Sequence, residues 1–309
     1  MSRVFTVAQV IVPIFAAIFL GFLARRKKLL SAEQTQGLQE FVMKIGLPCV
    51  IFNSCLTANI GAESLGLMAM VLPFVLISTF WAFSARKKQF PHHNLPMLFC
   101  AQETGMLGIP LFMILFGVDQ AYRIGILDIT QAIAVYPVIG ILSAKTGENP
   151  TIKSILKSVS TSPLLIMCAL GLTMNFSGLR DAMDSFGILG IITETTGFLA
   201  QPVSALMIFS VGYNFSLDSG NRGKILKISA IHFCLFAISG LIIQAGLFLL
   251  PGIEPITRWS VLMYTTLPAS YLAPNLGRTD EDRTVASGVC SILTVVSLLI
   301  FCCIAIAVA

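Results

Sequence analysis

Long apolar runs, separated by short polar or basic segments, dominate the pattern along the chain. Most runs have the ~20 residues that an α-helix needs to cross the hydrocarbon core of a bilayer. The first run is followed by basic residues in place of a cleavage site, so we expect it to be retained. The pattern predicts ten transmembrane helices over residues 4–24, 36–57, 64–85, 94–117, 123–144, 151–175, 186–215, 225–250, 256–277 and 284–309.

The composition supports a membrane domain with almost no mass outside the bilayer. The 309 residues are 56% hydrophobic and only 11% charged, with a mean hydropathy of +0.86, whereas soluble domains carry about 25% charged residues. This excludes a soluble globule, a disordered chain and a nucleic-acid-binding protein. The surrounding partner is therefore membrane lipid. The eight cysteines fall inside apolar runs, where we expect them to act as small hydrophobic residues without a structural disulfide or metal site.

The distribution of Lys and Arg predicts the orientation in the membrane. Of the 20 basic residues, 15 lie in the connections that follow the odd-numbered predicted helices. Basic connections are retained in the cytoplasm. We therefore expect a multi-pass protein of the inner (plasma) membrane with both termini outside.

The chain divides into two repeats of five predicted helices, over residues 1–149 and 150–309. Pro48 in the second predicted helix corresponds to Pro202 in the seventh, and Pro110 in the fourth corresponds to Pro268 in the ninth. Because five is an odd number, the two repeats insert with opposite topology. Inverted repeats with matching broken helices are typical of secondary transporters, whose substrate sites lie at the repeat interface.

The second proline pair predicts breaks in the fourth and ninth helices. Pro110 and Pro268 cannot donate the backbone hydrogen bond of a regular helix, and Gly105 and Gly108 loosen the same turn of the fourth helix. Such interruptions are tolerated only inside protein or beside a water-filled cavity. The half-helix N-termini would carry partial positive charge, which favours a small anionic substrate.

Several motifs resemble the auxin efflux carrier family of membrane transport proteins. They occur in order over nearly the whole chain: GFLARR at 21–26, LLS at 29–31, GLP at 46–48, IF at 51–52, GMLGIPL at 105–111, LPAS at 267–270 and SILTVVSL at 291–298. The resemblance implies an all-α fold of ten helices in inverted repeats, with broken helices 4 and 9 crossing. It also implies carriage of organic anions: dicarboxylates such as malate or malonate for compact bacterial members, and auxin for the plant carriers.

We further expect an elevator-type mechanism in which helices 3–5 and 8–10 carry the site past a static scaffold of helices 1, 2, 6 and 7. The resemblance implies that this scaffold joins two copies as a homodimer. Two departures from the family pattern matter. Only a short stretch at 146–150 joins the repeats, where the plant carriers have a long cytoplasmic insertion, and this favours a compact bacterial member. Glu103 stands where the family usually has Asn, and a carboxylate repels an anion unless it is protonated or paired with a cation.

Ionisable residues inside predicted helices are functional candidates. Glu103 is a candidate H⁺ or Na⁺ coupling site, or alternatively forms a structural hydrogen bond to a backbone carbonyl freed by the break. Asp128 is a second candidate coupling residue, or alternatively a solvated or capping residue. Lys44, eight residues (about 12 Å) into the second helix, either attracts the anion and neutralises Glu103 or extends to the cytoplasmic interface.

Neutral polar residues and helix-break residues are the candidate substrate contacts, although hydroxyls also pack helices together in membranes. With Glu103, the predicted substrate site comprises Pro48, Asn53, Ser54, Gly105, Gly108, Pro110, Gln131, Pro202, Ser204, Pro268, Ser270 and Asn275.

The sequence as a whole predicts a secondary transporter for a small organic anion, with no cofactor except a coupling Na⁺ or H⁺. A bile-acid-type sodium symporter shares the inverted five-helix repeats and is the alternative. A cation–proton exchanger would need acidic pairs at both breaks, and the ninth helix has none. A membrane sensor would carry a signalling domain, which we do not find in this sequence. An intramembrane enzyme would need a nucleophile and a base, or a metal cluster. The sequence shows neither, so we expect no enzymatic activity.

Overall fold

The computed structural model describes residues 3–58, 61–143, 160–215, 221–249 and 252–308. Regular structure in these residues is helical, apart from one isolated antiparallel β-bridge between Gln102 and Ala269. The α-helices are α1 (Arg3–Arg26), α2 (Ala32–Phe41), α3 (Leu47–Leu56), α4 (Ala62–Lys88), α5 (Leu95–Cys100), α6 (Ile109–Phe116), α7 (Ala121–Ser143), α9 (Pro163–Phe176), α10 (Leu179–Ser185), α11 (Ile188–Ala200), α12 (Val203–Asn214), α13 (Arg222–Leu249), α14 (Pro255–Thr266) and α15 (Asp280–Val308).

Within the described residues, six helical segments are long and apolar enough to cross a membrane, or seven if the bent pair α9 and α10 is one span. The six segments are Ala8–Arg26, Ser64–Lys88, Val118–Leu142, Ile188–Asn214, Arg222–Leu249 and Asp280–Val308. Shorter helices occupy the other four predicted runs. The run at 36–57 contains a π-helix, those at 94–117 and 256–277 are interrupted, and the run at 151–175 begins before the described residues. The boundary between the predicted repeats, at 149 and 150, also lies outside them.

Local sequence accounts for several helix ends. Ser31 and Gln34 form a capping box that starts α2. Proline stands in the first turn of α3, α5, α6, α9 and α14, where its missing N–H is not needed. Basic residues in the last turns of α1 and α4 complement the negative ends of the helix dipoles.

Two π-helices, η1 (Val42–Gly46) and η2 (Thr104–Gly108), share one sequence pattern. Each ends in glycine and is followed by a large apolar residue and then by Pro48 or Pro110. A π-turn changes the register of the backbone hydrogen bonds, which allows the helix to continue past the proline. The expectation that Pro110 breaks the fourth helix is therefore wrong, because the interruption lies at 101–103, before η2.

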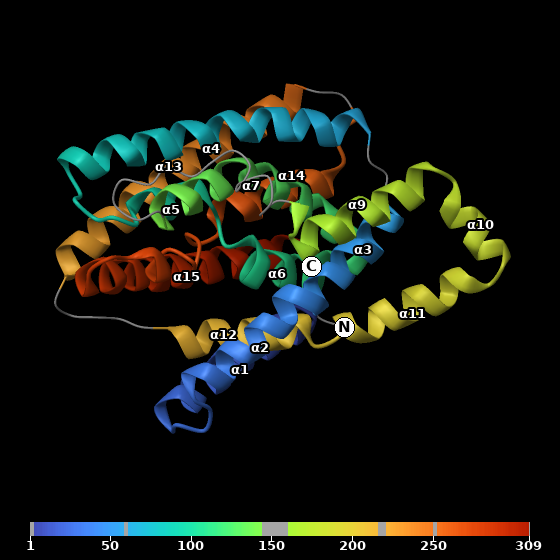
Figure 1. The fold of residues 1–309 in the computed structure, drawn as a ribbon, viewed down its shortest axis with the longest axis horizontal. Helices are drawn as coiled ribbons and strands as arrows, with labels where there is room; N and C mark the ends of the chain where they lie inside the picture. Colours follow the sequence, from blue (N-terminus) through green and yellow to red (C-terminus); the bar gives the residue numbers. More distant parts are fainter. Residues whose placement is uncertain (1–2, 59–60, 144–159, 216–220, 250–251, 309) are drawn as a thin grey trace.

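The helices shown in Figure 1 pack around two hydrophobic cores. The first core is formed by α4, α5, α7, α13, α14 and α15, with α4 and α13 side by side along one edge. The second core joins α1, α3, α6, α9 and α12 with parts of α7, α14 and α15. The interrupted segments lie where these cores meet, since α5 contributes to the first core and α6 to the second.

Candidate functional site

Two interrupted segments, between α5 and η2 and after α14, pair with each other through their backbones. The Glu103 N–H donates to the Pro268 carbonyl at 2.8 Å, and the Ser270 N–H donates to the Ala101 carbonyl at 3.1 Å. Leu267 is extended, as expected for a residue that precedes proline. Each segment thereby satisfies backbone groups that the other leaves open, as an interruption at membrane depth requires.

The Glu103 carboxylate bridges the two interrupted segments. Its Oε1 accepts a hydrogen bond from the Met106 N–H at 3.2 Å, and its Oε2 accepts one from the Tyr271 N–H at 2.6 Å. The residue is only 7% exposed. Within the described part of the chain, no Lys, Arg or His forms an ion pair with it. Its negative charge is therefore balanced mainly by backbone dipoles.

A second carboxylate belongs to a polar network on α7. The Gln131 side chain accepts from the Gln102 N–H at 2.8 Å and donates to the Gln102 carbonyl at 2.9 Å. The second carboxylate is that of Asp128, and one of its oxygens accepts from Gln131 at 2.9 Å and from the Thr104 hydroxyl. The Tyr264 hydroxyl donates to Gln131 at 3.0 Å. This network attaches α7 to both interrupted segments where residues 101–103 pair with residues 268–270, a junction that we call the crossing.

A cavity of about 1010 Å³ reaches this crossing. Glu103, Asp128 and Gln131 line it, and Arg25 and Lys44 line it as well. The Lys44 side chain is 65% exposed, which places it at the mouth, whereas Glu103 and Gln131 are buried. Further polar or small lining residues are Gln102, Thr104, Gly105, Ser270, Tyr271, Asn275, Ser287, Ser291 and Thr294. The cavity is therefore acidic and hydroxyl-rich inside and has two basic residues in its outer lining.

Lys44 has a different partner from the one expected. Its ammonium bonds the Glu40 carboxylate at 2.7 Å, one turn earlier on the same helical stretch. Arg25 donates to the Tyr213 and Phe215 carbonyls at the C-terminal end of α12. Neither basic group neutralises the acids at the crossing in this structure.

Several predicted contact residues lie away from the cavity lining. Asn53 accepts from the Thr196 hydroxyl at 2.6 Å, which joins α3 to α11. Ser54 accepts from the Tyr122 N–H at 2.6 Å and so joins α3 to the start of α7. The other predicted residues outside the lining are Pro48, Gly108, Pro110, Pro202, Ser204 and Pro268, although the Pro268 carbonyl takes part in the backbone crossing.

The structure adds residues that the sequence reasoning did not select. Thr104, Tyr264, Tyr271 and Thr294 all join the polar site, and the Tyr271 hydroxyl lies 2.7 Å from the Thr294 hydroxyl. Their position in the sequence could have indicated them, because each is a polar residue within an apolar run and lies inside, or within three residues of, one of the motifs given above. Among the described residues, no group of three or more His, Cys, Asp or Glu side chains could hold a metal ion.

Comparison with known proteins adds one finding. A family model described as membrane transport protein matches residues 6–305, which is nearly the whole chain. No curated protein matches this sequence.

Proposed function

Because the chain belongs to the membrane transport protein family, the auxin efflux carrier family, we propose that it moves a small organic anion by elevator-type alternating access. Membership makes it a multi-pass membrane transporter rather than an enzyme. The observation that carries the finer proposal is the backbone pairing of the two interrupted segments beside a cavity of about 1010 Å³. Discontinuous helices at a repeat interface are the usual substrate site of such transporters.

Symmetry in the helix packing supports ten helices in two inverted repeats. In the first repeat α4 packs on α5 and α7, and in the second α13 packs correspondingly on α14 and α15. Between the repeats, α1 packs on α12 and α3 packs on α9. These last two interfaces are close: a Cβ on Gly21 would overlap the backbone of α12, and one on Gly171 would overlap the backbone of α3. Small residues allow such close helix contacts in membranes.

The two hydrophobic cores support a division into a scaffold and a moving part. Helices α4, α5, α7, α13, α14 and α15 share the first core and, together with α6, constitute the proposed moving part. Helix α6 and parts of α7, α14 and α15 contact the scaffold through the second core. Helices α1, α3, α9 and α12 share the second core and constitute the proposed scaffold. By resemblance to the family, the scaffold joins two copies as a homodimer. The basic connections support an orientation with both termini outside the cell.

Coupling to H⁺ or Na⁺ follows from the charges of the site. Glu103 and Asp128 both line the cavity, and two unit charges 4 Å apart repel by about 4 kcal/mol at an effective dielectric constant of about 20. An organic anion bound beside an ionised Glu103 would experience that repulsion. A proton or Na⁺ that enters with the anion removes it. The same acidity favours the sodium-coupled, bile-acid-type alternative.

The test is thermal unfolding of the purified protein with mono- and dicarboxylates, with and without Na⁺, at pH 5.5 and 7.5. Ligands that bind the folded state raise the melting temperature. A rise with small carboxylates supports the proposed substrate class, and its dependence on Na⁺ or pH identifies the coupling ion. A rise only with Na⁺ and bulky steroid acids would favour the alternative. No rise with any acid at millimolar concentration would refute anion carriage.

A further inference from the structure

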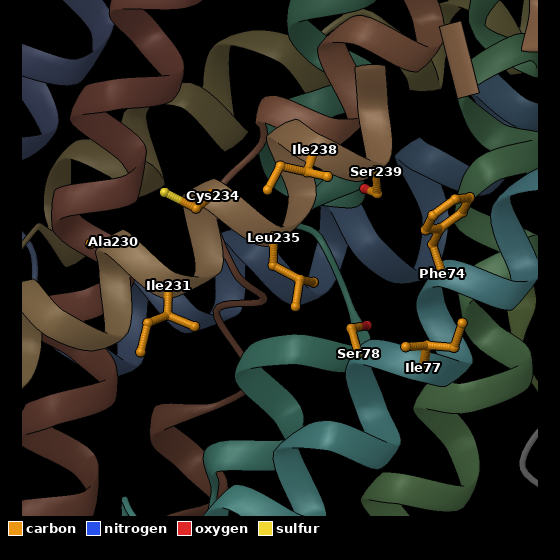
Figure 2. Close-up of a pocket in the computed structure, with 9 residues that line it drawn as sticks. All are labelled: Phe74, Ile77, Ser78, Ala230, Ile231, Cys234, Leu235, Ile238 and Ser239. Atoms are coloured by element: carbon orange, nitrogen blue, oxygen red, sulfur yellow. The ribbon is translucent and has the colours of Figure 1, made fainter. Parts of the chain in front are cut away.

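An apolar groove of about 550 Å³ opens between α4 and α13 (Figure 2). Phe74 and Ile77 of α4 line one side, and Ile231, Leu235 and Ile238 of α13 line the other. Ile77 is 65% exposed and Ile238 is 58% exposed, so the groove opens onto the outer surface. Both helices are candidate membrane spans, and that surface therefore faces lipid.

The groove offers no free polar group to a ligand. Two hydroxyls line it, and both are used within the protein: Ser78 donates to the Phe99 carbonyl at 2.7 Å, and Ser239 donates to the Phe236 carbonyl at 2.8 Å. An apolar recess in contact with lipid is filled by hydrocarbon. Along α13 the lining runs from Ala230 to Ser239, about 14 Å at 1.5 Å per residue. This length matches one leaflet, which is half of the ~30 Å hydrocarbon core.

Basic side chains continue the groove at one end. Helices α4 and α13 are antiparallel, because Met70 lies against Gly246 while the Lys227 ammonium lies 5.3 Å from the Phe90 ring centre. Lys227 is one turn before Ile231 and on the same face of α13, since residues four apart in a helix are neighbours. Lys88 is three turns beyond Ile77 at the corresponding end of α4.

These two lysines are available to a ligand. Both are exposed, and neither forms an ion pair with any residue that the structure describes. By contrast, the neighbouring Lys224 is paired with Glu281. The basic-residue bias places this end of the helices at the cytoplasmic leaflet, where anionic lipids gather and where basic pockets between helices bind their headgroups.

We propose that the groove between α4 and α13 binds an anionic phospholipid of this leaflet, with one acyl chain along Ile77, Ile231 and Leu235 and the phosphate at Lys88 and Lys227. The groove selects for hydrocarbon, and the lysines select for negative charge. The site is independent of the substrate cavity and of the direction of transport.

Native Cys234 provides a direct probe, because it lines the groove and is exposed. The full chain in detergent is treated with an uncharged alkylating reagent, with dioleoyl phosphatidylglycerol or dioleoyl phosphatidylcholine added at equal concentration. We expect phosphatidylglycerol to slow the modification of Cys234 severalfold. Each of the two lysines should raise the affinity for an anionic lipid about fivefold. About 25-fold more phosphatidylcholine should therefore be needed for the same effect. Cys303, which is exposed on α15, is the internal control and keeps its rate.

Two variants test the two halves of the site. The double variant Lys88→Gln/Lys227→Gln should lose the preference for phosphatidylglycerol, whereas the control Lys27→Gln/Lys28→Gln removes two charges at the end of α1 and should keep it. Ala230→Phe fills the groove at an exposed position and should reduce the lipid retained in native mass spectra. Equal protection by both lipids, or protection of Cys303 as strong as that of Cys234, would overturn the proposal. A preference unchanged in the double variant would do so too. None of these outcomes depends on the transport proposal.

Discussion

The substitution Glu103→Gln tests the electrostatic interpretation of the site. It removes the negative charge at the crossing while the side chain keeps an amide oxygen that accepts one of the two backbone hydrogen bonds, from Met106 or Tyr271. The repulsion that it removes is about 4 kcal/mol for an anion 4 Å away, which is about 10³-fold in affinity. In the wild type, we expect a proton to enter with the anion, so that binding weakens as the pH rises. In the variant, this dependence should be largely lost.

Isothermal titration calorimetry of a stabilising carboxylate, in two buffers of different ionisation enthalpy, counts the protons taken up on binding. We expect the count to fall by about one in Glu103→Gln, and the affinity at pH 7.5 to rise by up to about 10³-fold. Glu40→Gln is the matched control, because Glu40 lines the same cavity but is paired with Lys44. An unchanged proton count in a Glu103→Gln protein that melts normally would refute the reasoning.

Three further predictions concern the packing of the fold. Gln131→Leu leaves the Gln102 N–H and the Tyr264 hydroxyl without their partner and should lower the free energy of unfolding by about 2 to 4 kcal/mol, measured by thermal or denaturant melting in detergent. The thiols of Cys55 on α3 and Cys168 on α9 lie 3.6 Å apart, so a mild oxidant should link them, as peptide mass spectrometry would show. Gly212→Val places side-chain atoms into the backbone of α1 and should destabilise the protein by more than about 2 kcal/mol; an unchanged melting temperature would contradict the close packing.

Much of the helical architecture could be predicted from apolar runs, because hydrocarbon requires every backbone group to be paired within a helix. The run at 225–250 became α13 almost residue for residue, and the break at Pro268 followed from its missing donor. The position of the interruption in the fourth run, at 94–117, was harder to predict. Proline at 110 suggested a break there, but the preceding π-turn accommodates it, and no proline or glycine marks the real interruption at Ala101.

The candidate site was predictable only in part, because it is assembled from residues far apart in the chain. Glu103 and Asp128 stood out as acids within apolar runs, and both line the cavity. Gln131 was selected as a substrate contact, yet most of its hydrogen bonds hold the crossing together. Asn53 and Ser54 looked equivalent to it from the sequence, but they bind neighbouring helices instead. Sequence spacing within one helix could not distinguish a residue that lines the cavity from one that bonds a neighbouring helix.

The β-bridge between Gln102 and Ala269 also constrains how the protein is made. Its two residues are 167 positions apart in the sequence, a length that a ribosome synthesises in roughly 10 to 30 s. During that interval the Glu103 N–H and the Ala101 carbonyl lack their partners from the second segment, at a depth where water cannot replace them. The nascent first half must therefore keep this segment near the membrane surface, or shielded by the insertion machinery, until the ninth helix emerges. Truncated chains that end before Pro268 should accordingly be degraded rather than accumulate.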